Sequence, residues 1–230
     1  MWQSFYGQEI DCSQSVFEPG CAELMSFSSA SPDRVAFTYV LPTSSTRALV
    51  EFTVFAVKPL SAQALSADLA AAIEQRVKGA AFSVLRSEQG VLPMGLTHAL
   101  AALGGYDHAS TYVRVGLFAG AARPATGYAF QRIQRWATDC AARIAGGGSP
   151  VAHAKDAWLL ARMDSLFLRV IQRQPQLAPD MFMGIFARVD SQRVIRFLSD
   201  QGRLSDYAAI VWALPFRPFL RQLFRLPSWS

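Results

Sequence analysis

Three glutamates are the candidates for acid–base chemistry. Glu9 and Glu51 lie inside apolar runs that predict strands, and Glu88 lies in the stretch Ser87-Glu88-Gln89-Gly90-Val91. In residues 48–54, alternation places Glu51 on one strand face and only apolar side chains on the other. If the Glu51 face lines an apolar cavity, desolvation raises the pKa of this carboxyl and makes it a proton donor. A solvent-facing strand carboxylate is the plainer interpretation, and Glu51 taken alone favours it.

A run of small residues, residues 115–128, is the candidate cofactor site. We expect a strand over residues 112–118 to enter it and a helix to begin at Thr126-Gly127. Small residues let a backbone approach a ligand closely, and a helix N-terminus offers free N–H groups and partial positive charge. Such a terminus suits a pyrophosphate or an electron-rich flavin edge. A tight strand-to-helix connection without a ligand explains the same residues equally well.

Aromatic and basic residues alternate in the C-terminal segment, residues 216–225. Arginines recur at every fourth position, at Arg217, Arg221 and Arg225, and phenylalanine and leucine fill most of the rest. A basic face opposite an aromatic face suits a helix lying in a membrane interface. A helix docked on the core with its arginines in water explains the pattern equally well. Nucleic-acid binding is disfavoured because the basic residues do not extend into a broader patch.

Composition narrows the class of protein. The 230 residues are 51% apolar and 17% charged, with a net charge of +5, which predicts a globular protein of one large or two small domains. No apolar run reaches the roughly 20 residues of a membrane helix, and the N-terminus shows no secretory signal. There is no phosphate-binding P-loop and no G-x-G-x-x-G dinucleotide fingerprint. We interpret the cysteines as reduced cytosolic thiols, and neither they nor the histidines have a metal-binding spacing: Cys12, Cys21, Cys140, His98, His108 and His153.

The elements that must position the glutamates are predicted as an antiparallel sheet with one helix. Short runs rich in Val, Phe, Tyr and Leu, separated by turn residues, predict strands over residues 2–10, 22–28, 35–41, 48–57 and 81–85. Short connections favour antiparallel pairing, and residues 88–90 are predicted as a turn. A helix is predicted over residues 61–77, with Ser61 or Ser66 as its cap and a stripe of Leu65, Leu69 and Ile73.

The second half of the chain is predicted to be helical. A helix is expected over residues 129–144, and the run Gly146-Gly147-Gly148-Ser149-Pro150 is the strongest break in the sequence. Residues 151–173 have helical period, and three short helices are expected to follow up to Arg225. We therefore divide the chain into a sheet region at 1–111, a strand–loop–helix at 112–148 and a helical region at 149–230.

Taken together, several stretches of the sequence resemble the bacterial lycopene β-cyclases, a family of flavoproteins. Each stretch is weak alone, but their order and spacing are specific, and the likeness runs over nearly the whole chain. It covers about the last two-thirds of a typical family member. The matching stretches are QSFYGQE at 3–9, FEP at 17–19, LMSF at 24–27, FTYVLP at 37–42, TRALVEFT at 46–53, EQGVLPM at 88–94 and RPATGYAF at 123–130.

The resemblance implies a fold and a reaction. The fold would be α+β: the antiparallel-sheet substrate domain of a flavoprotein-monooxygenase-like fold and a helical C-terminal region, with the N-terminal Rossmann module absent. The reaction would be the acid-catalysed cyclisation of the ψ-ends of lycopene to β-rings, an intramolecular lyase or isomerase step of carotenoid biosynthesis. The cofactor would be reduced FAD, with NAD(P)H as reductant. The protein would be cytoplasmic and peripheral to the inner membrane, with the basic aromatic tail on the membrane surface.

Carried over by position, the resemblance also assigns residues. Glu51 matches an acid of the family's Glu-Glu-Thr or Glu-Asp-Thr motif and is predicted as proton donor, Glu9 matches the Gly-Gln-Glu stretch as an acid–base or cation-stabilising group, and Glu88 is third. Residues predicted to face the flavin are Gly120, Pro124, Thr126, Gly127 and Tyr128. The sequence departs from the family pattern in three positions, with Phe52 in place of a second acid, Ser26 in place of an aspartate after Leu-Met, and Ala121 in place of the aspartate that contacts the ribityl chain in related flavoproteins.

Two other functions remain open from the sequence. One is a related FAD-dependent monooxygenase or oxidoreductase acting on another hydrophobic substrate, and the other is a non-catalytic, membrane-associated remnant. The Glu51 and Glu88 motifs favour the cyclase, because a monooxygenase needs no buried proton donor there. The missing dinucleotide fingerprint favours the remnant.

Overall fold

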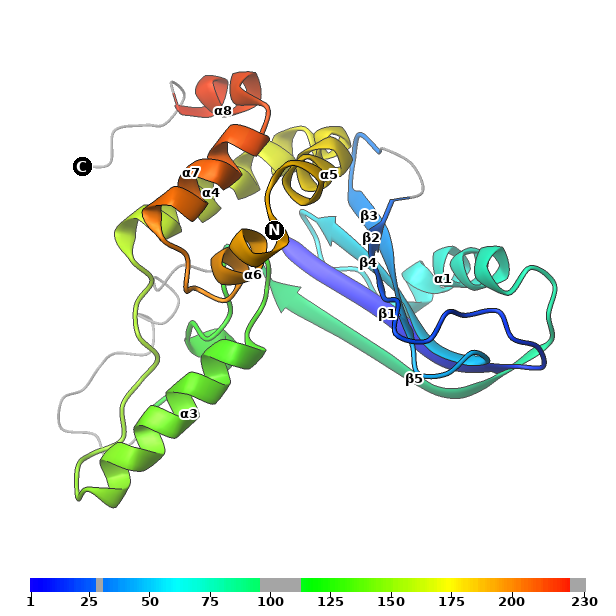
Figure 1. The fold of residues 1–230 in the computed structure, drawn as a ribbon, viewed down its shortest axis with the longest axis horizontal. Helices are drawn as coiled ribbons and strands as arrows, with labels where there is room; N and C mark the ends of the chain where they lie inside the picture. Colours follow the sequence, from blue (N-terminus) through cyan, green and yellow to red (C-terminus); the bar gives the residue numbers. More distant parts are fainter. Residues whose placement is uncertain (28–30, 96–112, 224–230) are drawn as a thin grey trace. The chain divides into compact units, whose positions relative to one another are not determined.

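The computed structural model of this chain describes residues 1–27, 31–95 and 113–223. Contacts divide these residues into two units. The first comprises the described part of Met1–Leu92 together with Gln174–Pro179, and the second comprises the described parts of Pro93–Arg173 and Asp180–Ser230. Figure 1 shows that the strands lie in the first unit and most of the helices in the second.

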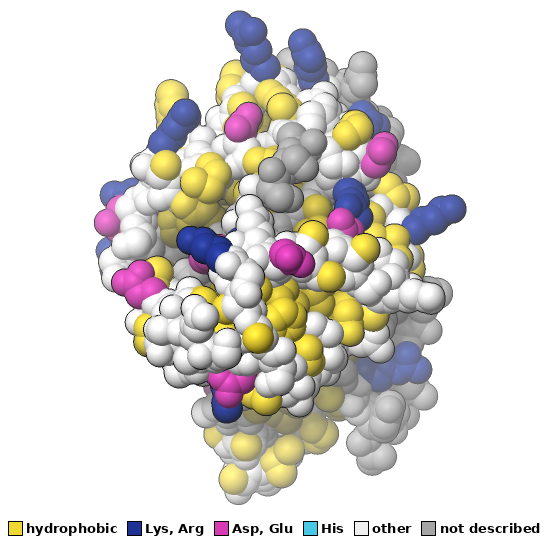
Figure 2. All heavy atoms as spheres, turned by 90° about the vertical axis from the view of Figure 1, so that its right-hand side faces the viewer, with side chains coloured by type: hydrophobic (Ala, Val, Ile, Leu, Met, Phe, Trp, Pro, Cys, Tyr) yellow, Lys and Arg dark blue, Asp and Glu magenta, His cyan; other side chains and the backbone are white. Residues whose placement is uncertain are grey.

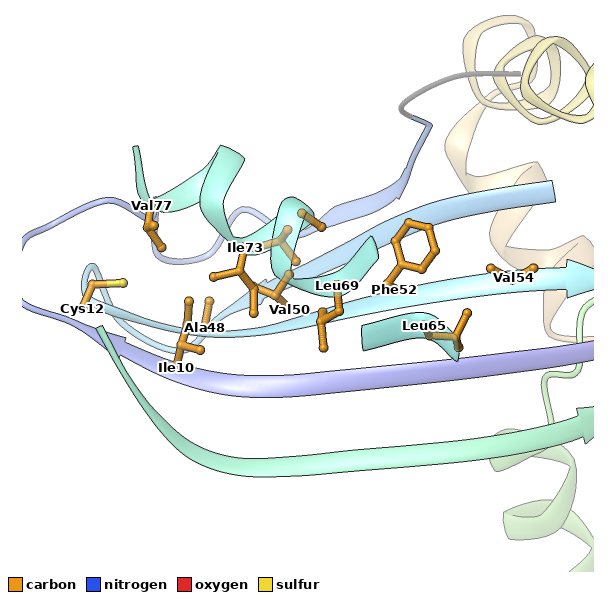
Figure 3. Packing of buried hydrophobic residues seen from close by; sticks show 12 residues of the cluster. Ile10, Cys12, Ala48, Val50, Phe52, Val54, Leu65, Leu69, Ile73 and Val77 are labelled. Atoms are coloured by element: carbon orange, nitrogen blue, oxygen red, sulfur yellow. The ribbon is translucent and has the colours of Figure 1, made fainter. Parts of the chain in front are cut away.

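The first unit is built on a five-stranded sheet with the order β2-β3-β4-β1-β5. Antiparallel ladders join β1 to β4, β4 to β3 and β3 to β2, and Figure 3 shows β5 running opposite to β1. The predicted antiparallel sheet is therefore confirmed. The strands are β1 (Trp2–Cys12), β2 (Glu23–Ser26), β3 (Val35–Pro42), β4 (Arg47–Ala56) and β5 (Phe82–Pro93).

One face of this sheet is covered by α1 (Ala62–Val77). Ser61 caps the helix by accepting a hydrogen bond from the Ala64 N–H at 3.2 Å, as one of the two predicted caps. The predicted stripe of Leu65, Leu69 and Ile73 is buried to 2% exposure or less against the even-numbered residues of β4 (Figure 3). Each such side chain contributes about 1.5–3 kcal/mol by burial. Because α1 occupies this face, the odd-numbered side chains of β4 lie on the opposite face.

The turn predicted at residues 88–90 is wrong. Strand β5 runs without interruption from Phe82 to Pro93. Gly90 is extended, and a Cβ added to it would lie 2.5 Å from two ring carbons of Phe5. This glycine therefore marks a close approach of an aromatic ring to a strand backbone and not a change of chain direction.

The second unit consists of helices and connecting loops. Its elements are the 3₁₀ helix η1 (Leu117–Ala119), α3 (Phe130–Ala145), α4 (Trp158–Arg173), part of α5 (Ala178–Arg188), α6 (Ser191–Leu198), α7 (Leu204–Ala213) and α8 (Phe216–Leu223). The short 3₁₀ helix η2 (Pro175–Leu177) and the first residues of α5 group with the first unit. The predicted helix at 129–144 and the glycine-rich break after it are confirmed.

Three predictions for the second half are wrong. Residues 113–118 contain no strand, and a 3₁₀ turn begins at Leu117. The helix predicted from residue 151 begins at Trp158, because contacts with neighbouring elements, described below, hold residues 151–157 in an irregular conformation. Four α-helices, not three, follow Arg173 in the described residues. Residues 28 and 112, Arg225, His98 and His108 lie outside the described residues.

Figure 2 shows charged side chains of both signs interspersed with apolar ones on one face of the molecule. The residues coloured in that view form no continuous basic patch on this face.

Candidate active site

Glu51 lies at the middle of β4 on the sheet face opposite α1. It pairs in register with Gly7 of β1 on one side and with Tyr39 of β3 on the other. Its side chain is half-buried. The register thus places Glu51 near the centre of the sheet face that the helix leaves uncovered.

Gly7 separates Glu51 from Glu88. A Cβ added to Gly7 would lie 3.3 Å from the Glu51 Cβ and 3.4 Å from the Glu88 Cγ. The two glutamates therefore flank the same glycine from β4 and β5, the strands on either side of β1, with no side chain between them. The sequence predicted each carboxylate separately, and the sheet order β4-β1-β5 brings them together.

The environment of Glu51 favours its protonated form. Desolvation by burial is the main cause that raises its pKa, and the nearby charge of Glu88 raises it further. A hydrogen bond of 2.8 Å, donated by the Thr53 hydroxyl to Glu51 Oε1, opposes these effects in part. The sequence predicted Glu51 as a proton donor on the condition that the carboxyl is desolvated. The structure meets that condition.

Arg86 joins the other two predicted carboxylates. Its Nε donates to Glu9 Oε2 at 2.7 Å and its Nη1 donates to Glu88 Oε2. The Arg86 side chain is 53% exposed, whereas those of Glu9 and Glu88 are 20% and 32% exposed. Sequence reasoning missed Arg86, although its spacing of two residues from Glu88 places both on one strand face. We call Glu9, Glu51, Glu88 and Arg86 the acid cluster.

Aromatic side chains continue the same sheet face beyond the acid cluster. Phe37, fully buried on β3, pairs in register with Thr53. Its ring makes edge contacts with the rings of Tyr39 and Phe55, both at 5.2 Å between centroids. This side of the cluster is therefore apolar.

The loop predicted to face a flavin belongs to the second unit and is internally bonded. The N–H groups of residues 125–128 all donate within the chain: Ala125 to Asp164, Thr126 and Gly127 to the Arg123 carbonyl, and Tyr128 to the Thr126 hydroxyl. The helix predicted to begin at Thr126-Gly127 begins at Phe130, and its Ala129 cap makes no side-chain hydrogen bond.

Only part of the predicted flavin site therefore has the expected form. Gly120 and Gly127 have φ values of +88° and +70°, which favour glycine, and Pro124 is buried while Tyr128 is 47% exposed. The free N–H donors that the prediction required at 125–128 are absent, since all four are engaged. These residues do not, as they lie here, form the anion-binding turn expected of them.

A buried ion pair that the sequence did not indicate holds this loop. Arg123 is 1% exposed and binds both carboxylate oxygens of Asp164, at 3.1 and 3.0 Å. The guanidinium also donates to the Phe197 carbonyl and lies 4.0 Å from the centre of the Phe197 ring. Burial raises the pKa of Asp164, and its hydrogen bonds with Arg123 oppose that shift. The motif residue Arg123 thus ties the loop to α4 and α6.

His153 anchors the start of the same loop. Its Nε2 accepts a hydrogen bond of 3.0 Å from the Gly116 N–H, and its ring lies 4.7 Å from the Trp136 ring. Trp136 in turn donates to the Val151 carbonyl at 2.7 Å. These contacts explain why residues 151–157 are not helical. Burial, assisted by the charge of Arg132, lowers the pKa of His153.

The C-terminal helix α8 presents two different sides. Phe219 lies toward α4, 6.5 Å from the Phe167 ring, and Gln222 accepts a 2.8 Å hydrogen bond from Arg173. Arg217 and Arg221 are exposed. Part of the aromatic face therefore docks on the second unit.

The described residues contain no cluster of metal-binding side chains, and their three cysteines, Cys12, Cys21 and Cys140, are free. None of the helices in the described ranges has the length and apolar character needed to cross a membrane.

Known proteins resemble this chain over almost its full length. A family model described as "Lycopene cyclase protein" matches residues 1–224. A protein of Paracoccus sp. (strain N81106 / MBIC 01143) named "Lycopene beta-cyclase" is 30% identical over 99% of this chain. The match covers 60% of that relative, so the chain spans about three-fifths of the relative's length. No solved structure matches.

Proposed function

Because the chain belongs to the lycopene cyclase family, we propose that it contains the acid–base residues of a lycopene β-cyclase. The substrate would be lycopene or a related acyclic carotenoid, and the reaction would be cyclisation of a ψ-end to a β-ring. The observation that supports the proposal most strongly is the half-buried Glu51, whose pKa is raised beside an apolar sheet face.

The cyclisation requires one proton in and one proton out. We propose that protonated Glu51 transfers its proton to the terminal double bond, which leaves a tertiary carbocation on the polyene. The neighbouring double bond attacks this cation, and the new carbon–carbon bond closes the ring. A ring proton is then lost to a carboxylate, so that the product is an isomer of the substrate and no electrons are gained or lost.

Glu9 and Glu88 are the proposed partners of Glu51. Glu88 flanks Gly7 opposite Glu51, so its charge lies near the position at which a cation would form on a substrate lying over Gly7. A carboxylate fixed before the reaction stabilises developing positive charge without having to reorient. Glu9 shares the Arg86 guanidinium with Glu88 and is the second candidate for cation stabilisation or proton acceptance.

The family resemblance adds reduced FAD, maintained by NAD(P)H, as the cofactor. Bound reduced flavin would supply an electron-rich ring that stabilises positive charge. Gly120, Pro124, Thr126, Gly127 and Tyr128 remain the residues proposed to face it. Because the N–H groups at 125–128 donate within the chain, no step of the reaction is assigned to this loop.

A location at the cytoplasmic side of a membrane is a further part of the proposal. The flavoprotein-monooxygenase-like fold is another part of it. The support for membrane contact is the exposure of Trp212 at 87% and Phe216 at 67%, beside the exposed Arg217. Aromatic and basic side chains together favour a membrane interface. Binding to anionic vesicles is the measurement that addresses it.

The test of the function is colour formation in a bacterium that accumulates lycopene. The chain should be expressed alone and joined to the part of the Paracoccus relative that it does not match. We expect a shift from red to orange and the appearance of β-rings by chromatography, and Glu51→Gln should reduce ring formation by at least about 100-fold, since a general acid contributes that much. Glu74→Gln, on the exposed side of α1, is the matched control and should leave ring formation unchanged.

Each alternative predicts a different result. Unchanged ring formation in Glu51→Gln would remove Glu51 from the mechanism. Oxygenated products without rings would favour a monooxygenase, and no product from any form would favour a non-catalytic remnant.

A further inference from the structure

Arg86 binds two of the three carboxylates of the acid cluster and leaves the third alone. Its two hydrogen bonds go to Glu9 and Glu88. In the part of the chain that the structure describes, Glu51 has no ion-pair partner, and its neighbour is the neutral Thr53 hydroxyl. The positive charge is therefore distributed unequally among the three acids.

The cluster holds three acids and one base, so not all of its carboxyls can be ionised and compensated. The groups around Glu51 come from three strands: Tyr39 from β3, Glu9 from β1, and Glu88 with Arg86 from β5. A carboxylate with a hydrogen-bonded cation favours its charged form, whereas a desolvated carboxyl near another carboxylate favours its neutral form. One arginine can thus decide which of the three acids holds a proton.

We propose that Arg86 is a positioning residue for the cyclisation: it holds Glu9 and Glu88 as ionised partners, so that the proton used in the reaction resides on Glu51. This inference rests on the proposed function for its meaning in catalysis, but the distribution of the proton is a property of this chain. Arg86 itself need not touch the substrate.

The choice of arginine fits this role. Its planar guanidinium presents several N–H donors in a fixed fork, so separate nitrogens bind Glu9 across the strand pair and Glu88 on its own strand. Because the Arg86 side chain is 53% exposed, these ion pairs add little to folding stability. Replacing Arg86 therefore changes the charge of the cluster without removing part of the core.

The test is a pH titration of the glutamate side-chain carboxyls in the intact 230-residue chain. Carbon NMR of the protein labelled with 13C-glutamate monitors the titration. In the wild type, the Glu88 signal should not change over the pH range in which Glu51 loses its proton. In Arg86→Gln, the Glu88 and Glu51 signals should titrate over the same range, because two neighbouring carboxyls then share one proton. Arg47→Gln is the matched control, since Arg47 forms a similar exposed cross-strand pair with Asp11 at 3.1 Å.

Three results would overturn the inference. The first is that the pH dependence of the Glu51 and Glu88 signals is the same in Arg86→Gln as in the wild type. The second is an equal change in Arg47→Gln. The third concerns the wild type alone and holds even if Arg86→Gln does not fold: a Glu88 signal that already follows Glu51.

Activity provides a second measurement that separates this inference from the proposed function. In the active form, Arg86→Gln should reduce ring formation about tenfold, part of the 100-fold or more that a general acid contributes. It should also move the alkaline limb of the pH–rate profile to higher pH, because loss of the cation favours the protonated form of the carboxyls that then share the proton. A merely structural role would reduce the rate and leave that limb in place. If no form makes β-rings, the proposed function fails, while the carboxyl titration still decides whether Arg86 directs the proton.

Discussion

The two units of this chain each contain an arginine bound by acids, and the two arginines differ in burial and in charge balance. Arg123 is 1% exposed and binds both carboxylate oxygens of Asp164, and it also contacts a carbonyl, an aromatic ring and, at 3.9 Å, Asp200, which Arg132 binds as well. Arg86 is half exposed and is outnumbered by three carboxyls. A buried charge must be compensated, whereas a half-exposed cluster tolerates an excess of acid. The balanced pair is suited to hold a loop, and the unbalanced one is suited to exchange a proton.

The largest expected effect follows from burial of the Arg123 pair. Arg123→Ala leaves Asp164 buried without its cation, and breaking such a pair costs about 3–5 kcal/mol. Urea unfolding followed by tryptophan fluorescence measures this loss, because Trp136, Trp158 and Trp212 lie in the second unit.

Arg34→Ala is the control for Arg123→Ala. Arg34 binds Asp68 through one nitrogen at 3.0 and 3.2 Å, but both side chains are about one-third exposed. The loss should be at most about 1 kcal/mol. Similar losses in the two variants would contradict the view that burial distinguishes the two kinds of cluster.

The same contrast explains how much the sequence could predict. The sheet and α1 were predictable because their apolar periodicities are local, as in the stripe of Leu65, Leu69 and Ile73. The face of Glu51 followed from alternation alone. Its neighbours did not, because Glu88 reaches Gly7 only through the order β4-β1-β5, which no local pattern encodes.

Errors arose where a distant contact overrode a local signal. Gly90 has the composition of a turn, yet it is extended because the Phe5 ring occupies the space of a side chain. Residues 151–157 have helical period, yet His153 and the Val151 carbonyl are held by partners in the loop and α3. The Arg123–Asp164 pair spans 41 residues, so neither residue predicted the other.

The second prediction concerns His153, which holds the second unit as a neutral acceptor. His153→Phe keeps a ring beside Trp136 but leaves the Gly116 N–H without its acceptor, at a cost of about 1–2 kcal/mol. The folded-state pKa of His153 is lowered, so as pH falls below its ordinary value of 6.5 the unfolded chain gains a proton before the folded chain does. The wild-type advantage should therefore be full above pH 6.5 and shrink as pH falls.

Unfolding at a series of pH values compares the wild type with His153→Phe and His153→Gln. The glutamine variant keeps a side-chain acceptor that does not titrate, so its stability relative to His153→Phe should not depend on pH. A wild-type advantage over His153→Phe that grows on acidification would show that His153 is not held in its neutral form. The neighbouring Arg132, paired with Asp156 at 2.8 Å, is the charge that disfavours protonation.

The smallest expected effect, with the opposite response to acid, belongs to Glu51. Its folded-state pKa is raised, so above the ordinary value of 4.5 the unfolded chain loses this proton more readily than the folded chain. Folding is thus penalised as pH rises through this range, and Glu51→Gln removes the penalty while its amide oxygen can still accept from Thr53. We expect the variant to be more stable than the wild type at neutral pH by on the order of 1 kcal/mol, a size typical of single stabilising substitutions.

The stability difference between Glu51→Gln and the wild type should vanish below about pH 4.5, where the carboxyl holds its proton in both the folded and the unfolded state. Glu9→Gln, which removes a carboxylate that Arg86 binds, should give no such gain. If Glu51→Gln is less stable than the wild type at neutral pH, the charge of Glu51 is compensated in the folded state, as the charge of Asp164 is. The acid cluster and the Arg123–Asp164 pair would then not differ in charge balance.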